Sequence, residues 1–452
     1  MTSNHILIFD IGKTNKKYLV FDEEYTVVYE YTEELPETKD EDGFPCEDIH
    51  LLTDWIYTHA IKQLNNTEYN IKAINFSGYG ASFVLLDQEG RILAPLYNYL
   101  KPLDKNIRNQ FFDAYGDEKK LCLETCSPSL GNLNSGLQLY RLKYEKPAWF
   151  DSIRYALHLP QYLSFIFTRA ATSHLTSIGC HTMLWDFEKK DYHYWVRKEN
   201  ITALFPVNAN SDLWQSCRLN DQSIGAGIGL HDSSAALIPY LKLRSHPFIL
   251  LSTGTWCIAL NPFSTDPLTQ DELAQDCLCY LSYESKPIKA SRIFLGHEHQ
   301  EAVVRLADHF KVKENFYKSI TYDPQIINDQ NDMSFQDQTG LIKSGFERRP
   351  LNEYSNVTVA YHALIQDFVT TQVKSLQLIQ KELNGIDILV DGGFAQNELF
   401  MSLLARSLPQ AAVYAAEIHQ ASATGAAMVM HDGWNSQPLK EDLIKLKYYE
   451  SR

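Results

Sequence analysis

One short pattern, an apolar run followed by a polar glycine-containing turn and a second apolar run, occurs twice about half a chain apart. The first copy is ILIFDIGKTNKKYLVFD, with apolar runs at residues 6–9 and 18–21. The second copy is FILLSTGTWCIALNP, with apolar runs at residues 248–251 and 256–260. Short apolar runs on either side of a polar turn predict a β-hairpin. The repeat therefore predicts two related domains, which suits a chain of 452 residues.

Strands and helices are predicted to alternate along the rest of the chain. Further strand-like apolar runs lie at residues 27–31, 71–76, 83–86 and 386–390. Residues 359–383 carry apolar side chains with a period of 3.6, and the Asn-Gly pair that follows predicts the end of a helix. This alternation predicts an α/β fold. We place the first domain at residues 1–240 and the second at residues 241–452, and we expect a loop at residues 323–350.

The charge and the cysteines exclude several classes of function. The chain has 41 basic and 56 acidic residues, a formal net charge of −15. This balance argues against binding to nucleic acid or to an anionic membrane surface. The sequence shows neither a signal-peptide pattern nor an apolar stretch long enough to span a membrane. The eight cysteines are scattered without a CxxC pair, so we expect reduced thiols in a cytoplasmic protein rather than zinc ligands.

The first turn, DIGKTNKK, contains the Gly-Lys-Thr with which a P-loop ends. A P-loop also needs a glycine five residues before Gly12 and a helix after the turn. Leu7 occupies that position and a strand is predicted to follow, so both requirements fail. The turn instead suits a phosphate-binding hairpin. Asp10 lies at the carboxyl end of a predicted strand, where it can hold Mg²⁺ directly or through water. The hydroxyl, amide and lysine groups of the turn can bind phosphate. An ordinary polar hairpin remains an alternative for this segment taken alone.

Two later turns have related designs. Residues 252–255, STGT, form a second hydroxyl- and glycine-containing hairpin turn. Residues 391–397, DGGFAQN, form a glycine-rich turn between a predicted strand and a predicted helix, which suits the close approach of a nucleotide. Two phosphate-gripping hairpins and a nucleotide turn resemble the parts of the actin-like ATPase fold.

Six segments in order resemble the FGGY family of carbohydrate kinases, most of all its rhamnulokinase and fuculokinase branch. The chain resembles the two phosphate motifs in FDIGKTNKKYLVFD and LSTGTW, and the sugar-pocket hairpin in INFSGYGASFVLLDQEGRILAPLYNY. It resembles the middle segment in HLPQYLSFIFT and TSIGCHTMLWDF, the catalytic-base segment in GAGIGLHDSSAAL, and the adenosine motif in LVDGGFAQNELFMSLLA and ASATGAAMV. Two departures are Lys13, where a small or hydroxyl residue is usual, and YNYLKPLD, where the family has a Tyr-Arg-Asp stretch.

The resemblance implies two actin-like (ribonuclease H-like) domains with a nucleotide and sugar cleft between them. It implies phosphorylation of a sugar hydroxyl with ATP and Mg²⁺, on a ketose such as L-rhamnulose, L-fuculose or xylulose. The implied catalytic base is Asp232 and the implied metal residue is Asp10. The implied nucleotide contacts are Gly12, Lys13, Thr14, Asn15, Thr253, Gly254, Thr255, Gly392, Gly393, Asn397 and Gly425. The implied sugar contacts are Ser77, Tyr79, Ser82, Gln161 and His181.

Several of these predictions have alternative explanations. Asp232 opens a predicted helix and can serve as its N-cap. His297 and His299 of GHEHQE are expected to begin a helix, with a metal site as the alternative. At the level of the whole protein, the alternatives are a kinase of a non-sugar polyol signal and an actin-like ATP-binding protein with a regulatory or assembly role. We keep a homodimer as a candidate assembly.

Overall fold

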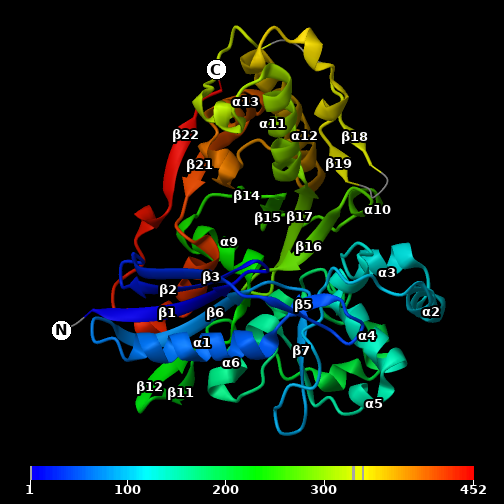
Figure 1. Cartoon of the computed structure of the whole chain (residues 1–452), viewed down its shortest axis with the longest axis vertical. Helices are drawn as coiled ribbons and strands as arrows, with labels where there is room; N and C mark the ends of the chain where they lie inside the picture. Colours follow the sequence, from blue (N-terminus) through cyan, green and yellow to red (C-terminus); the bar gives the residue numbers. More distant parts are fainter. Residues whose placement is uncertain (1–2, 328–330, 338–340, 452) are drawn as a thin grey trace. The chain divides into compact units, whose positions relative to one another are not determined.

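The computed structural model describes residues 3–327, 331–337 and 341–451. The chain forms two compact units (Figure 1). The first unit comprises Met1–Leu243, Cys279–Pro287 and His419–Leu443. The second comprises Arg244–Leu278, Ile288–Ile418 and Ile444–Arg452. Each unit has a seven-stranded sheet with helices packed against it, which confirms the predicted α/β class and its two sheet-containing domains.

The first sheet is an antiparallel meander continued by parallel strands. Across the sheet the strands are β11 (Gln215–Leu219), β12 (Gln222–Ala226), β6 (Asn70–Gly78), β1 (Asn4–Ile11), β2 (Asn15–Asp22) and β3 (Val27–Glu34), with β13 (Leu230–His231) beside β6. β1, β2 and β3 pair antiparallel, as the first apolar runs predict. β6 is parallel to β1, β12 and β13.

Helices cover both faces of this sheet. They are α1 (Ile49–Leu64), α6 (Leu159–Thr168), α9 (Asp232–Leu243) and α14 (Ala421–Met428). Leu7 and Phe9 of β1 pack in the apolar core with α1 and α6, which lie side by side in Figure 1. Ile6 and Ile8 pack in a separate core with α9 and α14. The two-residue period of a strand explains why neighbouring residues of β1 enter different cores.

Short helices and paired strands complete the first unit. The helices are α2 (Lys105–Tyr115), α3 (Glu118–Glu124), α4 (Ser135–Glu145), α5 (Pro147–Phe150), α7 (Leu175–Ile178), α8 (Tyr194–Lys198) and α15 (His431–Trp434). The strand pairs are β4 (Glu37–Lys39) with β5 (Pro45–Glu47), β7 (Phe83–Leu86) with β8 (Tyr155–His158), and β9 (Trp185–Asp186) with β10 (Asp191–Tyr192).

The second sheet repeats the plan of the first. Its order is β16 (Cys277–Leu281), β17 (Pro287–Ile293), β15 (Cys257–Asn261), β14 (Phe248–Thr253), β20 (Asp387–Gly392), β21 (Ala412–Glu417) and β22 (Lys445–Tyr449). β17, β15 and β14 pair antiparallel, whereas β14, β20 and β21 are parallel. The helices of this unit are α10 (Gln270–Leu273), α11 (Leu295–Phe310), α12 (Val357–Ile379) and α13 (Glu398–Ser407). The hairpin repeated in the sequence is thus the start of each sheet.

The structure divides the chain differently from the contiguous domains predicted at residues 1–240 and 241–452. The chain first leaves the first unit after Leu243, but residues 279–287 and 419–443 return to it. The return of α14 has a steric basis. A Cβ atom on Gly425 would lie 1.8 Å from the carbonyl oxygen of Ala235, so α14 and α9 are in contact through this glycine.

Two local predictions need correction. The predicted C-cap at Asn384-Gly385 is wrong, because α12 ends at Ile379; Leu383 is buried in the turn that follows, so an apolar period outlasts the helix. The second hairpin strand begins at Cys257 rather than Trp256, which lies in the turn. The predicted loop at residues 323–350 contains β18 (Phe335–Gln336) and β19 (Ile342–Lys343), and its residues 328–330 and 338–340 lie outside the described residues.

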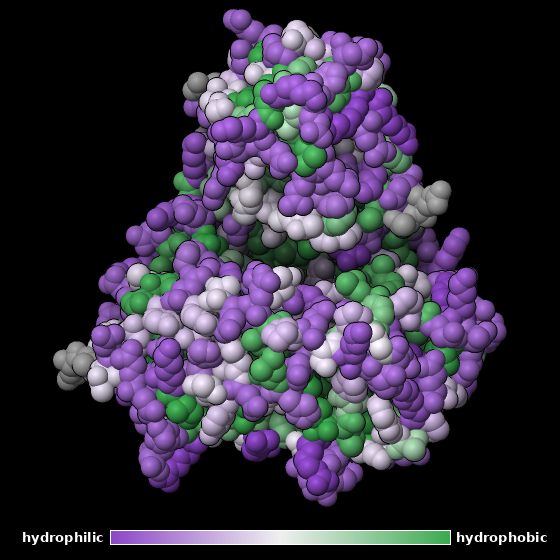
Figure 2. Space-filling model, viewed as in Figure 1, coloured by the Kyte–Doolittle hydropathy of each residue, from purple (hydrophilic) through white to green (hydrophobic). Residues whose placement is uncertain are grey.

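The described helices include none that combines the length and apolar character needed to cross a bilayer. Figure 2 shows mainly hydrophilic side chains on the visible face, with apolar side chains scattered among them.

Candidate active site

The carboxyl ends of three parallel strands bring two aspartates to one edge of the first sheet. Asp10 of β1 is in register with Ser77 of β6, and Leu230 of β13 is also in register with Ser77. Asp232 follows β13 directly, and its charge raises the pKa of Asp10. Ligands of open α/β sheets bind beyond the carboxyl ends of the strands. Asp10 and Asp232 therefore lie where a polar ligand of this unit is expected.

The Asp10 carboxylate is half-buried and has one firm hydrogen bond. Ser422 Oγ donates to Asp10 Oδ2 at 2.9 Å. Burial is the main effect on Asp10 and raises its pKa; the Ser422 hydroxyl lowers it, and Asp232 raises it again. The Ser77 hydroxyl makes no hydrogen bond of normal geometry in the described structure, yet it lies near enough to lower the pKa of Asp10. Two carboxylates held together in this way suit a bound cation.

Asp232 does not cap its helix in the predicted manner. It is the first residue of α9, and its Oδ1 accepts from the backbone N–H and the hydroxyl of Ser233, at 2.6 and 3.2 Å. An N-cap carboxylate would instead accept from an N–H two or three residues further on, and no such bond occurs in the described part of the chain. The side chain is 36% exposed, so the carboxylate remains accessible.

His231 supports Asp232 from the buried side. Its Nε2 lies 3.3 Å from Asp232 Oδ1 and 3.1 Å from Cys180 Sγ, and its ring stacks on Tyr280. Burial lowers the pKa of His231, while Asp232 raises it. Gly80 makes room for the ring, since a Cβ there would lie 2.8 Å from His231 Cδ2. His231 is not among the site residues predicted from the sequence, although the His-Asp pair in the predicted catalytic segment was a signal for it.

The turn at residues 12–15 presents hydrogen-bond donors to solvent. Gly12 N–H donates to Asn15 O at 3.0 Å, which closes the turn, and β2 follows at once. Among the described residues, the backbone N–H groups of Lys13 and Thr14 find no acceptor, and the side chains of Thr14 and Asn15 are exposed. This geometry suits an anion. The strand after the turn confirms that the segment is not a P-loop.

The three lysines in and directly after the turn have different surroundings. Lys13 forms an ion pair with Glu37 at 2.6 Å, with side chains 22% and 45% exposed. Lys16 is buried and bonded within the fold. Lys17 is in register with Asp10, lowers its pKa, and donates to Gln420. The predicted phosphate contact of Lys13 therefore competes with an existing ion pair, and Lys17 is the lysine beside the aspartates.

In the second unit, two predicted nucleotide turns lie next to each other. β14 and β20 are parallel with Thr253 in register with Gly392, so both turns begin at the same edge of the sheet. Gly254, Thr255, Gly392 and Gly393 are exposed there. Thr253 is buried: its Oγ1 donates to Asp391 O at 2.5 Å and accepts from Phe394 N–H at 3.0 Å. Thr253 thus holds the turns together, and its hydroxyl is not presented to solvent.

Two other predicted nucleotide contacts have structural roles. Asn397 is the N-cap of α13, accepts from Phe400 N–H at 3.1 Å, and donates to Tyr361 at 2.8 Å. Both ends of its amide are therefore used. Gly425 belongs to the first unit, where it allows α14 to contact Ala235. The small size of Gly425 is explained by this helix contact.

The predicted metal alternative at GHEHQE finds no support. Both histidines lie in the first two turns of α11. His297 is 41% exposed and faces Glu301, whereas His299 is half-buried and bonds Tyr361. Within the part of the chain that the structure describes, no group of three or more metal-binding side chains exists.

The five predicted sugar contacts are all buried in the first unit. Gln161 donates to Gly229 O at 2.8 Å, just before Asp232, and its Oε1 lacks a partner among the described residues. Ser82 Oγ is likewise buried without a partner in the described structure. Tyr79 donates to Glu47, and His181 Nδ1 lies 3.1 Å from Leu133 O. Buried polar atoms without partners are uncommon and suit a polar ligand.

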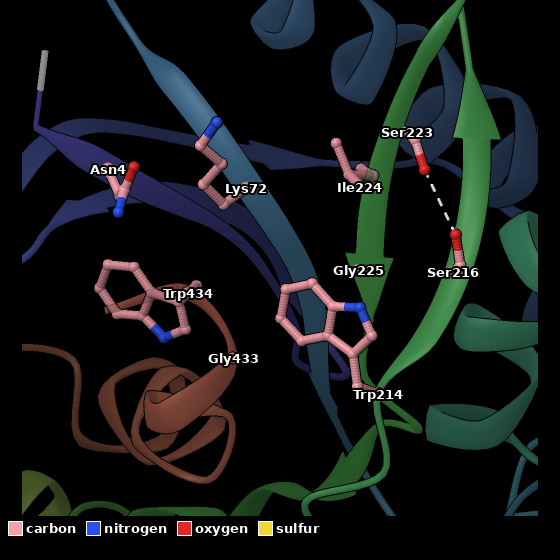
Figure 3. A pocket seen from close by; sticks show the side chains of 9 residues that line it. All are labelled: Asn4, Lys72, Trp214, Ser216, Ser223, Ile224, Gly225, Gly433 and Trp434. Carbon is pink, nitrogen blue, oxygen red and sulfur yellow. Dashed lines mark hydrogen bonds between the residues drawn. The ribbon is translucent and has the colours of Figure 1, made fainter. Parts of the chain in front are cut away.

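A separate cavity of 370 Å³ lies away from these residues (Figure 3). Trp214, Trp434 and Lys72 line it, and Trp214 packs on Gly225 and Gly433, where a Cβ would lie 2.0 and 2.3 Å from the indole. None of the predicted site residues lines this cavity. This cavity therefore does not mark the candidate site, whose residues are identified by their position at strand ends and by their polar chemistry.

Two family descriptions match the chain. Residues 5–203 match "FGGY family of carbohydrate kinases, N-terminal domain". Residues 245–438 match "Carbohydrate kinase FGGY, C-terminal domain". The two matches together span most of the sequence, in the order expected from its motifs.

Single proteins agree with these matches. A rhamnulokinase of Halalkalibacterium halodurans is 22% identical over 432 residues, covering 89% of this chain and 88% of that protein. The crystal structure of a carbohydrate kinase from Novosphingobium aromaticivorans has 21% identity and a TM-score of 0.77, covering 100% of this chain and 95% of its own. That of a xylulose kinase from Lactobacillus acidophilus has 14% identity and a TM-score of 0.79, covering 99% and 94%. At these identities the two structures show a shared fold.

Proposed function

Because this chain belongs to the FGGY family of carbohydrate kinases, we propose that it transfers the γ-phosphoryl group of ATP to a hydroxyl of a ketose. The proposed acceptors are L-rhamnulose, L-fuculose and xylulose. The similarity to a rhamnulokinase over most of both chains supports the first, and the fold shared with a xylulose kinase is compatible with the last.

The observation that carries this proposal is the pair Asp10 and Asp232 at the carboxyl ends of β1 and β13. A kinase of this kind needs a proton acceptor and a group that serves the metal. We assign the first role to Asp232, whose carboxylate is accessible. It takes the proton of the sugar hydroxyl as that oxygen bonds to the γ-phosphorus, and the bond from this phosphorus to the β,γ-bridging oxygen breaks to release ADP.

Asp10 is the proposed Mg²⁺ residue. Its raised pKa reflects burial and the charge of Asp232, both of which a cation would offset. Mg²⁺ is commonly held by one or two carboxylates together with substrate phosphates and water, so the small donor set here fits it. Bound there, Mg²⁺ would neutralise phosphate charge.

The exposed turns are the proposed phosphate and nucleoside contacts. In the first unit, the free donors of Lys13, Thr14 and Asn15 support phosphate binding. In the second unit, the exposed backbone at residues 254–255 and 392–393 supports binding of the rest of the nucleotide. Ser77, Ser82 and Gln161 are the proposed sugar contacts, since each has a buried oxygen without a partner in the described structure. We also propose a cytoplasmic location, which suits ATP use and eight reduced cysteines.

A panel assay tests the proposal. Purified full-length protein with Mg·ATP is offered single ketoses, other polyols and no acceptor, and ADP release is measured. We expect release only with one or a few ketoses. Release that needs a non-sugar polyol would favour a kinase of a polyol signal. Release that is independent of any acceptor would favour an actin-like ATPase and would overturn the kinase proposal.

A further inference from the structure

Lys16 directly follows the phosphate turn at residues 12–15, and its ammonium group is buried. It is 1% exposed and lies next to the turn on β2. Its Nζ donates to Gly12 O at 3.1 Å and to Lys13 O at 3.0 Å. Both carboxylate oxygens of Glu47 lie 2.9 Å from the same nitrogen. An ammonium group has three protons, so these partners leave none for a phosphate.

Glu47 extends this contact to the predicted sugar strand. It ends β5, is 4% exposed, and its Oε2 also accepts from Tyr79 OH at 3.2 Å. Tyr79 directly follows β6, and its backbone N–H donates to Ile11 O at 3.0 Å. The buried carboxylate of Glu47 therefore connects the phosphate turn, through Lys16, to Tyr79.

Burying such a pair has a cost that packing alone would not require. Two charges removed from water are often no more stable than apolar residues of the same volume, so stability is a weak explanation for the pair. Its geometry gives a better one, because the two carbonyl acceptors belong to the turn whose free N–H groups face solvent.

We propose that Lys16 and Glu47 are positioning residues, which fix the phosphate turn at residues 12–15 relative to Tyr79 without touching the nucleotide. This inference rests on the proposed use of Mg·ATP. The alternative is that the ammonium group of Lys16 binds the phosphate directly. Glu47 would then pair with Lys16 only while no nucleotide is bound.

Charge-removing variants separate these roles. Lys16→Met, Glu47→Gln and the double variant are compared with Lys39→Met, an exposed lysine on the neighbouring strand β4. Mg·ADP affinity is measured by calorimetry on the full-length protein without sugar. If the pair positions the turn, each single variant should weaken the binding of Mg·ADP by about 10-fold or more, because even a small misplacement of the turn is costly. The double variant is no weaker than either single variant, because it leaves no unpaired buried charge.

Direct neutralisation predicts a different pattern and would overturn the proposal. Glu47→Gln would then bind Mg·ADP as well as the unmodified protein or better, and the double variant would be as weak as Lys16→Met. If Lys16→Met does not fold, the comparison between Glu47→Gln and the double variant still decides.

Amide hydrogen exchange supplies a readout without ligand. The N–H of Gly12, bonded to Asn15 O, should exchange faster in Glu47→Gln and in the double variant than in Lys39→Met. Unchanged exchange would overturn the positioning role. If the unmodified protein fails to bind Mg·ADP, the proposed function fails, whereas the exchange data still test the role of the pair.

Discussion

Ser422 donates a 2.9 Å hydrogen bond to Oδ2 of Asp10, joining two residues that are 412 positions apart. The helix that carries Ser422 therefore helps to orient the carboxylate at the end of β1. Asp10 is the proposed metal residue and Ser422 supports it, so substitution of Asp10 should reduce activity more than substitution of Ser422.

Asp10→Asn should abolish most Mg²⁺-dependent kinase activity, and Ser422→Ala should lower it by about 10-fold, the usual effect of losing a group that supports a metal ligand. Because the pKa of Asp10 is raised, its folded state holds the proton more tightly, so ionisation at neutral pH opposes folding. Asp10→Asn should therefore raise the Tm of the ligand-free protein. Activity titrated with Mg²⁺ and thermal unfolding at pH 7 check both effects; a lower Tm with retained activity would contradict the assignment.

Asp232→Asn keeps the size of the side chain but removes the proton acceptor. We expect kcat to fall by about 10²–10⁴-fold with small changes in both KM values, because the lost interaction acts mainly in the transition state. A helix-capping role predicts near-normal kcat, since Asn caps as well as Asp. Steady-state kinetics on protein with an unchanged circular dichroism spectrum decide between the two.

Lys13→Ala should be milder than Asp10→Asn, with kcat/KM for ATP reduced by less than about 10-fold. The reason is that Lys13 already pairs with Glu37 at the surface, and such pairs contribute little. Glu37→Ala is the matched control, because it frees Lys13 without removing it. If Lys13→Ala proved as damaging as Asp10→Asn, this lysine would have to contact phosphate during catalysis.

Two glycines of the predicted adenosine motif should respond differently to alanine. Gly425→Ala places a Cβ 1.8 Å from a backbone oxygen, and overpacking of this kind destabilises by about 1–3 kcal/mol. At Gly393 the nearest atom to a new Cβ is 3.9 Å away, so Gly393→Ala should fold normally and weaken Mg·ADP instead. Urea unfolding and calorimetry on both variants test this contrast, and a normally stable Gly425→Ala would refute the packing argument.

Burial lowers the pKa of His174 to about 4, while its nitrogens bond Thr176 and Ser211. Below its ordinary pKa of about 6.5, the unfolded chain binds a proton that the folded chain does not. Stability should therefore fall as pH drops from about 6.5 towards 4, by up to about 1.4 kcal/mol per pH unit for this group. His174→Gln should flatten that slope relative to His50→Gln, an exposed control, in unfolding experiments across this range. Parallel slopes would show that His174 is not the group responsible.

The sequence patterns predicted those elements of the fold that depend only on residues close together in the sequence. The apolar runs identified β1, β2, β14 and β20 because a buried strand needs consecutive apolar residues. The end of α12 was missed because Leu383 is buried by a turn, which continues the apolar period after the helix has ended.

The candidate site was predicted as a set of segments, but the role of single residues depends on contacts between them. Ser422 was missed because its partner, Asp10, lies at the other end of the chain. Thr253 was expected to face phosphate because nothing in STGT reveals its bond to Asp391. The burial of Lys16 had a signal, since the two-residue period of β2 puts it on the face of Tyr18 and Val20.

The return of residues 419–443 to the first unit has a consequence for biosynthesis. Domains usually fold in order as the ribosome releases them. Here α14 covers β1 and β6, so the first unit stays incomplete until residues 419–443 have been translated. A fragment that stops after Leu243 would expose the apolar face of Ile6 and Ile8, and it is a target for chaperones rather than an independent domain. β1 (Asn4–Ile11) thus stays partly uncovered until α14 (Ala421–Met428) has been translated.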